Sequence, residues 1–78
     1  MVERPLPEEI KQKILQKVKN KALAQKAFEY VRLVEKEDGT VYVKEEFDNT
    51  DHHALWFMVL AVVNYAQRLL RGEDIDDI

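Results

Sequence analysis

The chain has 78 residues, which fits one small domain and leaves no room for a second of ordinary size. A hydrophobic fraction of 46%, with three Phe, three Tyr and one Trp, is too high for a disordered chain. The formal net charge of −3 argues against a protein that binds nucleic acid over its whole surface. No apolar run approaches about 18 residues, and residues 1–10 do not resemble a secretory signal, so we expect a cytoplasmic protein with no membrane partner.

The composition also limits the chemistry that the side chains offer. The chain has no Cys and no Ser, so the usual acyl-transfer nucleophiles and thiolate metal sites are missing. The two glycines, Gly39 and Gly72, are isolated, so no glycine-rich loop can hold a phosphate. We therefore expect a non-enzymatic protein with no catalytic residue and no cofactor. The same lack of Ser and Cys, together with 35% charged residues, is typical of proteins from thermophiles.

The N-terminal part of the chain is expected to be helical after a flexible arm at residues 1–6. Pro7 suits the start of a helix, because the N–H that proline lacks has no partner there. Ile10, Ile14 and Val18 recur every four residues and predict a helix over residues 8–19.

A second helix is expected over residues 21–29, because the apolar stripe changes direction. Leu23 and Ala27 lie about 200° or more around the helix axis from Ile10, so one straight helix would present two different apolar faces. Asn20 is suited to cap the second helix. The alternative is one continuous helix whose two halves contact different partners.

A β-hairpin is expected after the helices, with its turn at residues 37–39. Gly39 supplies the positive φ that a tight turn needs. Pairing Lys36 with Thr40 places Leu33 opposite Val43, and the apolar residues then share one face. A two-residue loop would instead place Leu33 opposite a lysine and mix the two faces. The predicted apolar face consists of Val31, Leu33, Val41, Val43 and Phe47, and Val34 and Tyr42 lie on the opposite face with the charged residues.

A long apolar C-terminal helix is expected from a cap at residues 48–50 to about Arg71, with Gly72 as its stop and an acidic, flexible tail at residues 73–78. The fold class is therefore α+β and mainly helical: two N-terminal helices (or one broken helix), a β-hairpin and this helix. Its main buried face is predicted to comprise Leu55, Met58, Val59, Val62, Ala66 and Leu69.

The C-terminal helix has more apolar surface than one face can bury. Residues 54–63 are ten consecutive apolar residues, so a second face is apolar as well. One small domain has difficulty covering both faces, and we therefore expect a homodimer or higher oligomer, or a complex with another protein. The predicted interface consists of Trp56, Phe57, Leu60 and Val63. The alternative is that the hairpin and the first helices cover this helix completely.

A small winged-helix-like DNA-binding regulator is the alternative function. Residues 1–36 carry nine basic and five acidic residues, whereas residues 37–78 carry three and ten. Two short helices followed by a hairpin suggest a helix-turn-helix with a wing, in which lysines would contact phosphates. The predicted contacts are Lys13, Lys17, Lys21, Gln25 and Lys26.

Two groups of polar residues are not expected to form sites. Asp48, Asp51, His52 and His53 are the one compact set of potential metal ligands, but adjacent histidines on a helix point about 100° apart, so we predict no metal. The paired glutamates at residues 8–9 and 45–46 are expected to be solvated, because acid–base catalysis requires desolvated carboxyl groups.

Overall fold

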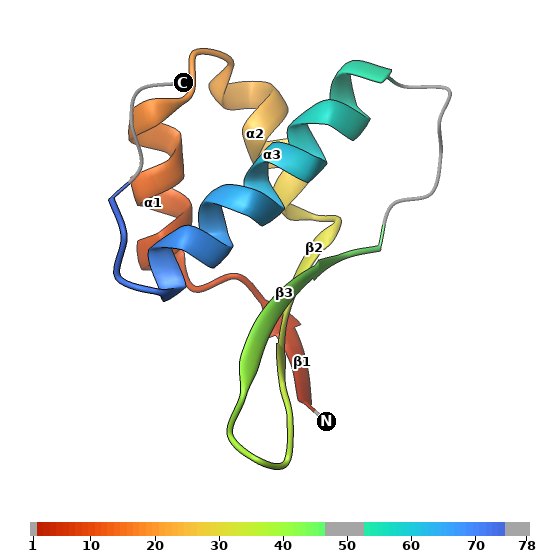
Figure 1. Cartoon of the computed structure of the whole chain (residues 1–78). Coiled ribbons are helices and arrows are strands. Elements are labelled where there is room, and N and C mark those ends of the chain that lie inside the picture. Colours follow the sequence, from red (N-terminus) through yellow and green to blue (C-terminus); the bar gives the residue numbers. More distant parts are fainter. Residues whose placement is uncertain (1, 47–52, 75–78) are drawn as a thin grey trace.

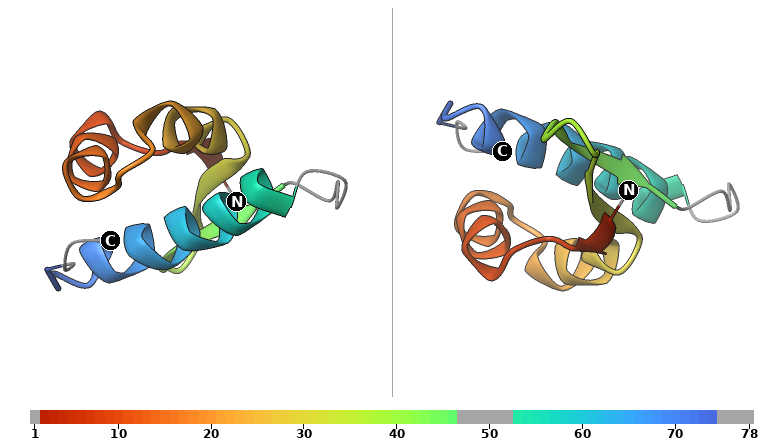
Figure 2. Two further views of the ribbon diagram at one scale, coloured as in Figure 1. Left: turned by 90° about the horizontal axis from the view of Figure 1, so that it is seen from above. Right: turned by 90° about the horizontal axis from the view of Figure 1, so that it is seen from below.

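A computed structural model describes residues 2–46 and 53–74, and within them the chain forms an α+β fold of three helices and a three-stranded antiparallel sheet. In chain order the elements are β1 (Val2–Pro5), α1 (Glu8–Lys17), α2 (Lys21–Phe28), β2 (Val31–Glu35), β3 (Val41–Glu45) and α3 (His53–Leu70). The helices gather at one end, and the β2–β3 hairpin projects away from them (Figure 1). Seen along the other direction, α1 and α2 form one layer and α3 forms a second (Figure 2).

The helices α1 and α2 are separate, as the change in the apolar stripe predicts. Val18 has an extended backbone conformation, with φ −91° and ψ 149°, and ends α1. The side chain of Asn20 then accepts a hydrogen bond from the Leu23 N–H at 3.0 Å and caps α2. The interpretation of residues 8–29 as one continuous helix is therefore wrong.

The register of the hairpin is the predicted one. Leu33 pairs with Val43, and the Lys36 N–H donates to the Thr40 carbonyl oxygen at 2.8 Å. Gly39 has a φ of +90°, the left-handed conformation that glycine adopts without a steric penalty. The two-residue loop that would mix the faces is excluded.

The strand β1 was not predicted, since residues 1–6 were expected to be an arm. It pairs antiparallel with β2, so that β2 is the central strand of the order β1-β2-β3. The Glu46 N–H donates to the Tyr30 carbonyl oxygen at 2.7 Å, and this places the even-numbered residues of β2 in hydrogen-bonded pairs with β3. The even-numbered residue Arg32 therefore makes no ladder hydrogen bonds with β1. Because Pro5 lies opposite Arg32, its nitrogen faces the open edge of the sheet, and the N–H that proline lacks is not needed there.

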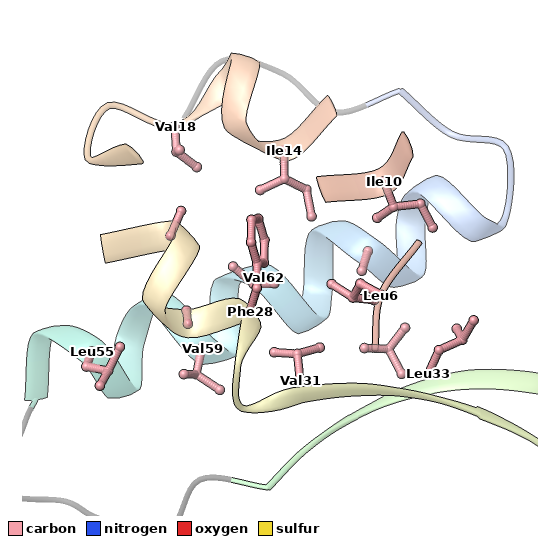
Figure 3. Close-up of a cluster of buried hydrophobic side chains, with 14 residues drawn as sticks. Leu6, Ile10, Ile14, Val18, Phe28, Val31, Leu33, Leu55, Val59 and Val62 are labelled. Carbon is pink, nitrogen blue, oxygen red and sulfur yellow. The ribbon is translucent and has the colours of Figure 1, made fainter. Parts of the chain in front are cut away.

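The core lies between the two helical layers, and β2 contributes Val31 and Leu33 to it. Figure 3 shows Ile14 of α1 and Val18, which follows α1, on the side of Phe28 and Val62, and Ile10 beside Leu6. Leu6, which follows β1, is only 3% exposed and ties the N-terminal segment to this core. The predicted main face of α3 is confirmed: Leu55, Val59, Val62 and Ala66 are buried, and Met58 and Leu69 pack partly buried against them.

The opposite face of the sheet holds one buried residue that was expected among polar neighbours. Val34 is fully buried although it is not part of the main core cluster. Its cross-strand neighbours are Glu3 and Tyr42, and the charged side chains around it belong to Arg32 and Lys44. Long basic side chains such as these can cover an apolar neighbour with their apolar stems while their charged ends stay in water.

The helix α3 ends at the predicted glycine. Gly72 has a φ of +82°, its N–H donates to Leu69 O, and the Glu73 N–H donates to Arg68 O, both at 3.0 Å. This pair of bonds is a Schellman motif, which satisfies the last carbonyl groups of a helix. Within residues 2–46 and 53–74, no helix is both long enough and apolar enough to cross a membrane. The cap predicted at residues 48–50 lies outside the described residues.

Candidate association surface

The outward face of α3 carries the most exposed aromatic residue of the described chain. Phe57 is 69% exposed and Leu60 is 38% exposed, although both lie in the apolar half of the helix. Residues three or four positions apart lie on one side of a helix, so Phe57 and Leu60 share one side. Val59 and Val62 share the other side, which is buried. The chain's own hairpin and helices therefore leave this part of α3 uncovered.

The four residues predicted to form an interface do not share one environment. Phe57 and Leu60 form the exposed part, which we call the α3 patch. Trp56 and Val63 are half-buried and pack against the chain's own core. The centre of an association surface would thus be Phe57, with Trp56 and Val63 at its margin.

A second group of exposed apolar side chains lies where the sheet extends past the helices. Val2 is 57% exposed, Val41 is 41% exposed and Leu70 is 39% exposed. Val2 and Val41 both lie opposite Glu35 in the ladder, so they share one face of the sheet. Together with Phe57 and Leu60, these are the large hydrophobic side chains that the described residues leave exposed.

A groove of about 570 Å³ lies between β3 and the C-terminal end of α3. We call it the hairpin groove, and it is lined by Leu33, Val41, Tyr42, Gln67, Leu70 and Arg71. The Gln67 amide Nε2 donates to the Val43 carbonyl oxygen at 3.0 Å and fixes β3 beside α3. The sequence alone does not predict this groove. Its one sequence signal is Leu70, an apolar residue near the end of the helix and outside the predicted main face.

The residues predicted to contact nucleic acid are spread over several faces. Lys13 forms an ion pair with Glu9 at 3.5 Å, and the Lys21 Nζ donates to the Val18 carbonyl oxygen at 3.2 Å. Gln25 and Lys26 are exposed on α2, and Lys17 is half-buried on α1. Of the five, Gln25 alone lines a second groove, beside α1, so the set does not form one patch.

This second groove, also about 570 Å³ in volume, lies between β1, α1 and α2 and has mixed charge. Arg4, Lys11 and Arg32 line it together with three glutamates. The Lys11 Nζ lies 5.9 Å from the centroid of the Phe28 ring, and Arg4 pairs with Glu35. Because charges of both signs alternate along its walls, the groove shows no preference for anions or cations.

A cluster of ion pairs covers the outer face of the sheet. The Lys44 Nζ lies 2.8 Å from a Glu3 carboxylate oxygen and 3.6 Å from Glu46, and Arg32 lies 3.8 Å from Glu46. The hydrogen bond from Lys44 lowers the pKa of Glu3 below its ordinary value of 4.5, and the same bond raises the pKa of Lys44. Glu3 and Glu46 are exposed, Arg32 and Lys44 are half-buried, and the ion pair between Glu3 and Lys44 joins the two edge strands across this face of the sheet.

Most of the potential metal ligands named from the sequence lie outside the residues that the structure describes. Asp48, Asp51 and His52 lie outside the described residues, and His53 is exposed at the first position of α3. In the part of the chain that the structure describes, no three such side chains gather as metal ligands would. The glutamates at residues 8–9 and 45–46 are exposed, as expected.

Comparison of the chain with protein-family models, with curated proteins and with solved structures finds no match.

Proposed function

We propose that this chain is a non-enzymatic, cytoplasmic interaction protein that associates with further copies of itself through the α3 patch. The observation that carries the proposal is Phe57, whose ring is 69% exposed on a helix that has already buried its other apolar face. Fully burying a Phe or Leu side chain contributes about 1.5–3 kcal/mol. Association would gain most of this free energy for Phe57 and a smaller part of it for Leu60, which is 38% exposed in the monomer.

The size of the chain supports the same proposal. A domain of about 60 residues buries only about 60% of the surface of its unfolded chain, so small domains often gain stability from a partner subunit. The sequence contains no Cys, so no disulfide can take that role. Half-buried Trp56 and Val63 flank the patch and would extend the apolar contact once a second copy covers Phe57 and Leu60.

The test compares the mass in solution of the wild-type chain and a Phe57→Glu variant. A carboxylate at an exposed helix position is tolerated in the monomer, but it would be desolvated in an association surface. We expect light scattering to give masses above 9.2 kDa for the wild type and the monomer mass for the variant at about 0.1–1 mM protein.

Gln16→Glu is the matched control, because Gln16 is exposed on α1 and the substitution adds the same charge to a helix. This control should associate as the wild type does. Equal masses for the wild type and Phe57→Glu would contradict the proposal.

Duplex DNA binding is the second candidate, and the geometry of α1 and α2 favours it. Three residues, Val18 to Asn20, join the two helices, which is the turn length of a helix-turn-helix, and the β2–β3 hairpin follows directly. Exposed Lys21, Gln25 and Lys26 would then contact the duplex.

The salt dependence of binding tests this candidate. Several phosphate contacts would weaken duplex binding steeply, by about 10³-fold or more, between about 50 and 200 mM salt. Lys26→Gln should reduce both the affinity and the salt slope, whereas Asn64→Ala, on the far layer of the fold, should change neither. The absence of binding at about 50 mM salt would exclude the candidate.

A further inference from the structure

The exposed apolar side chains fall into two groups of different shape. The α3 patch is convex, because the Phe57 ring projects from the surface of a helix. The hairpin groove is concave, with a volume of about 570 Å³, and its apolar floor includes Leu33, Val41 and Leu70. A projecting ring and an apolar groove are complementary, whereas two projecting rings are not.

The groove also suits the ring chemically. Tyr42 lies on its wall and can pair with a second aromatic ring. Arg71 lies at its rim, and a guanidinium group is attracted to the face of an aromatic ring. An aliphatic side chain such as Leu60 can occupy the remaining apolar floor.

One protomer cannot fill its own groove with its own ring. Phe57 and Leu70 belong to the same helix, α3, and are separated by about 20 Å along its axis at 1.5 Å per residue. The helix is rigid on this scale and Leu70 is itself part of the groove, so the ring that enters must come from a second copy.

We infer that α3 patches insert into hairpin grooves, so that copies of the chain associate head to tail. This inference rests on the proposed self-association and specifies the surface that the α3 patch contacts. A head-to-tail contact covers Phe57 and Leu60 together with Val41 and Leu70, whereas a symmetric contact between two α3 patches would leave Val41 and Leu70 exposed. Head-to-tail contacts that continue from copy to copy give rings or open chains, whereas two copies that exchange both contacts would form a closed two-fold dimer.

The test uses variants that each remove one of the two surfaces. Phe57→Glu removes the ring and keeps the groove. Leu70→Lys places a charge in the groove and keeps the ring, and a cation suits the C-terminal end of a helix. Val41→Lys blocks the groove from β3 instead, so that a fold defect in one groove variant does not decide the result. Circular dichroism checks that each variant is folded.

Sedimentation velocity, at about 0.1–1 mM protein, measures the number of chains in each species, for each variant alone and for equimolar mixtures. We expect each variant alone to sediment as a monomer of 9.2 kDa, and a mixture of Phe57→Glu with either groove variant to form a species of two chains and no larger one. In such a mixture one intact ring meets one intact groove, and the assembly then stops.

The other outcomes separate the inference from the proposal on which it rests. If both folded groove variants alone associate as the wild type does, the head-to-tail contact is wrong while association through the α3 patch stands. Mixtures that remain monomeric would also overturn the head-to-tail contact. A wild-type chain that stays monomeric at about 1 mM would overturn both.

Discussion

At the residue scale, neighbouring aromatic side chains on α3 have different roles. Trp56 is half-buried against the core, whereas Phe57 is largely exposed, because one residue along a helix turns the side chain by about 100°. The sequence placed both in one predicted interface, since a run of ten apolar residues does not show which of them the hairpin covers. The structure separates a packed side chain from an exposed one at this pair.

Alanine substitutions distinguish the two roles. Trp56→Ala should destabilise the monomer by about 1–3 kcal/mol, because it removes packing from a partly buried site. Phe57→Ala should change the stability by less than about 0.5 kcal/mol, as is usual for exposed positions. Urea unfolding at low micromolar concentration measures both. A larger loss for Phe57→Ala than for Trp56→Ala would show that the Phe57 ring packs within its own chain.

The ion pair between Glu3 and Lys44 predicts a pH dependence. Folding lowers the pKa of Glu3 below 4.5 through the hydrogen bond from Lys44, so the folded state favours the ionised carboxylate. The resulting stabilisation is complete above pH 4.5 and is lost as the pH falls through the lowered pKa. Glu3→Gln should therefore be less stable than the wild type at neutral pH and equally stable in strong acid.

Urea unfolding over a range of acidic pH values measures this difference. Glu45→Gln is the control, because Glu45 is an exposed carboxylate on the same strand as Lys44. A difference between the wild type and Glu3→Gln that does not change with pH would contradict the assignment. The folded-state pKa of Lys44 is raised, so its stabilisation is present below pH 10.5 and is lost only at higher pH.

At the scale of single elements, the break between α1 and α2 depends on the cap at Asn20. Its side chain satisfies the Leu23 N–H at the start of α2, a helix of only eight residues. Asn20→Ala should cost about 0.5–2 kcal/mol of unfolding free energy, measured by chemical denaturation. Lys19→Ala, a change at the exposed preceding residue, should cost much less. Equal effects of the two changes would argue against the cap.

The elements that could be predicted are those specified by local sequence. The period of the apolar residues predicts α1, α2 and the buried face of α3, and Gly39 together with alternation in β2 and β3 predicts the hairpin register. The strand β1 could not be predicted, because it has four residues, includes Pro5 and pairs with a strand far away in the chain. Its pairing depends on the tertiary fold rather than on its own composition.

The candidate surface was predictable only in part. The excess of apolar residues on α3 indicates that some side chains stay exposed, and Phe57 and Leu60 do. The hairpin groove could not be predicted, because it depends on where the end of α3 lies against β3, which the Gln67–Val43 hydrogen bond fixes. The proposed head-to-tail contact therefore needed the structure.

At the scale of the whole molecule, the exposed apolar side chains follow from the shape of the fold. The hairpin extends past the helices, so the far end of the sheet has no helix above it (Figure 1). The α3 helix lies as a single outer layer, so one of its sides has no neighbour (Figure 2). The three helices and three short strands bury one core, and within the described residues these two places stay uncovered.

The central claim is that the uncovered side of α3 makes the chain associate. Sedimentation equilibrium of the unmodified chain in a dilution series from about 1 mM to about 1 µM tests it most directly. We predict that the weight-average mass falls toward 9.2 kDa on dilution and exceeds that value at the highest concentrations. A mass of 9.2 kDa at every concentration would contradict the claim.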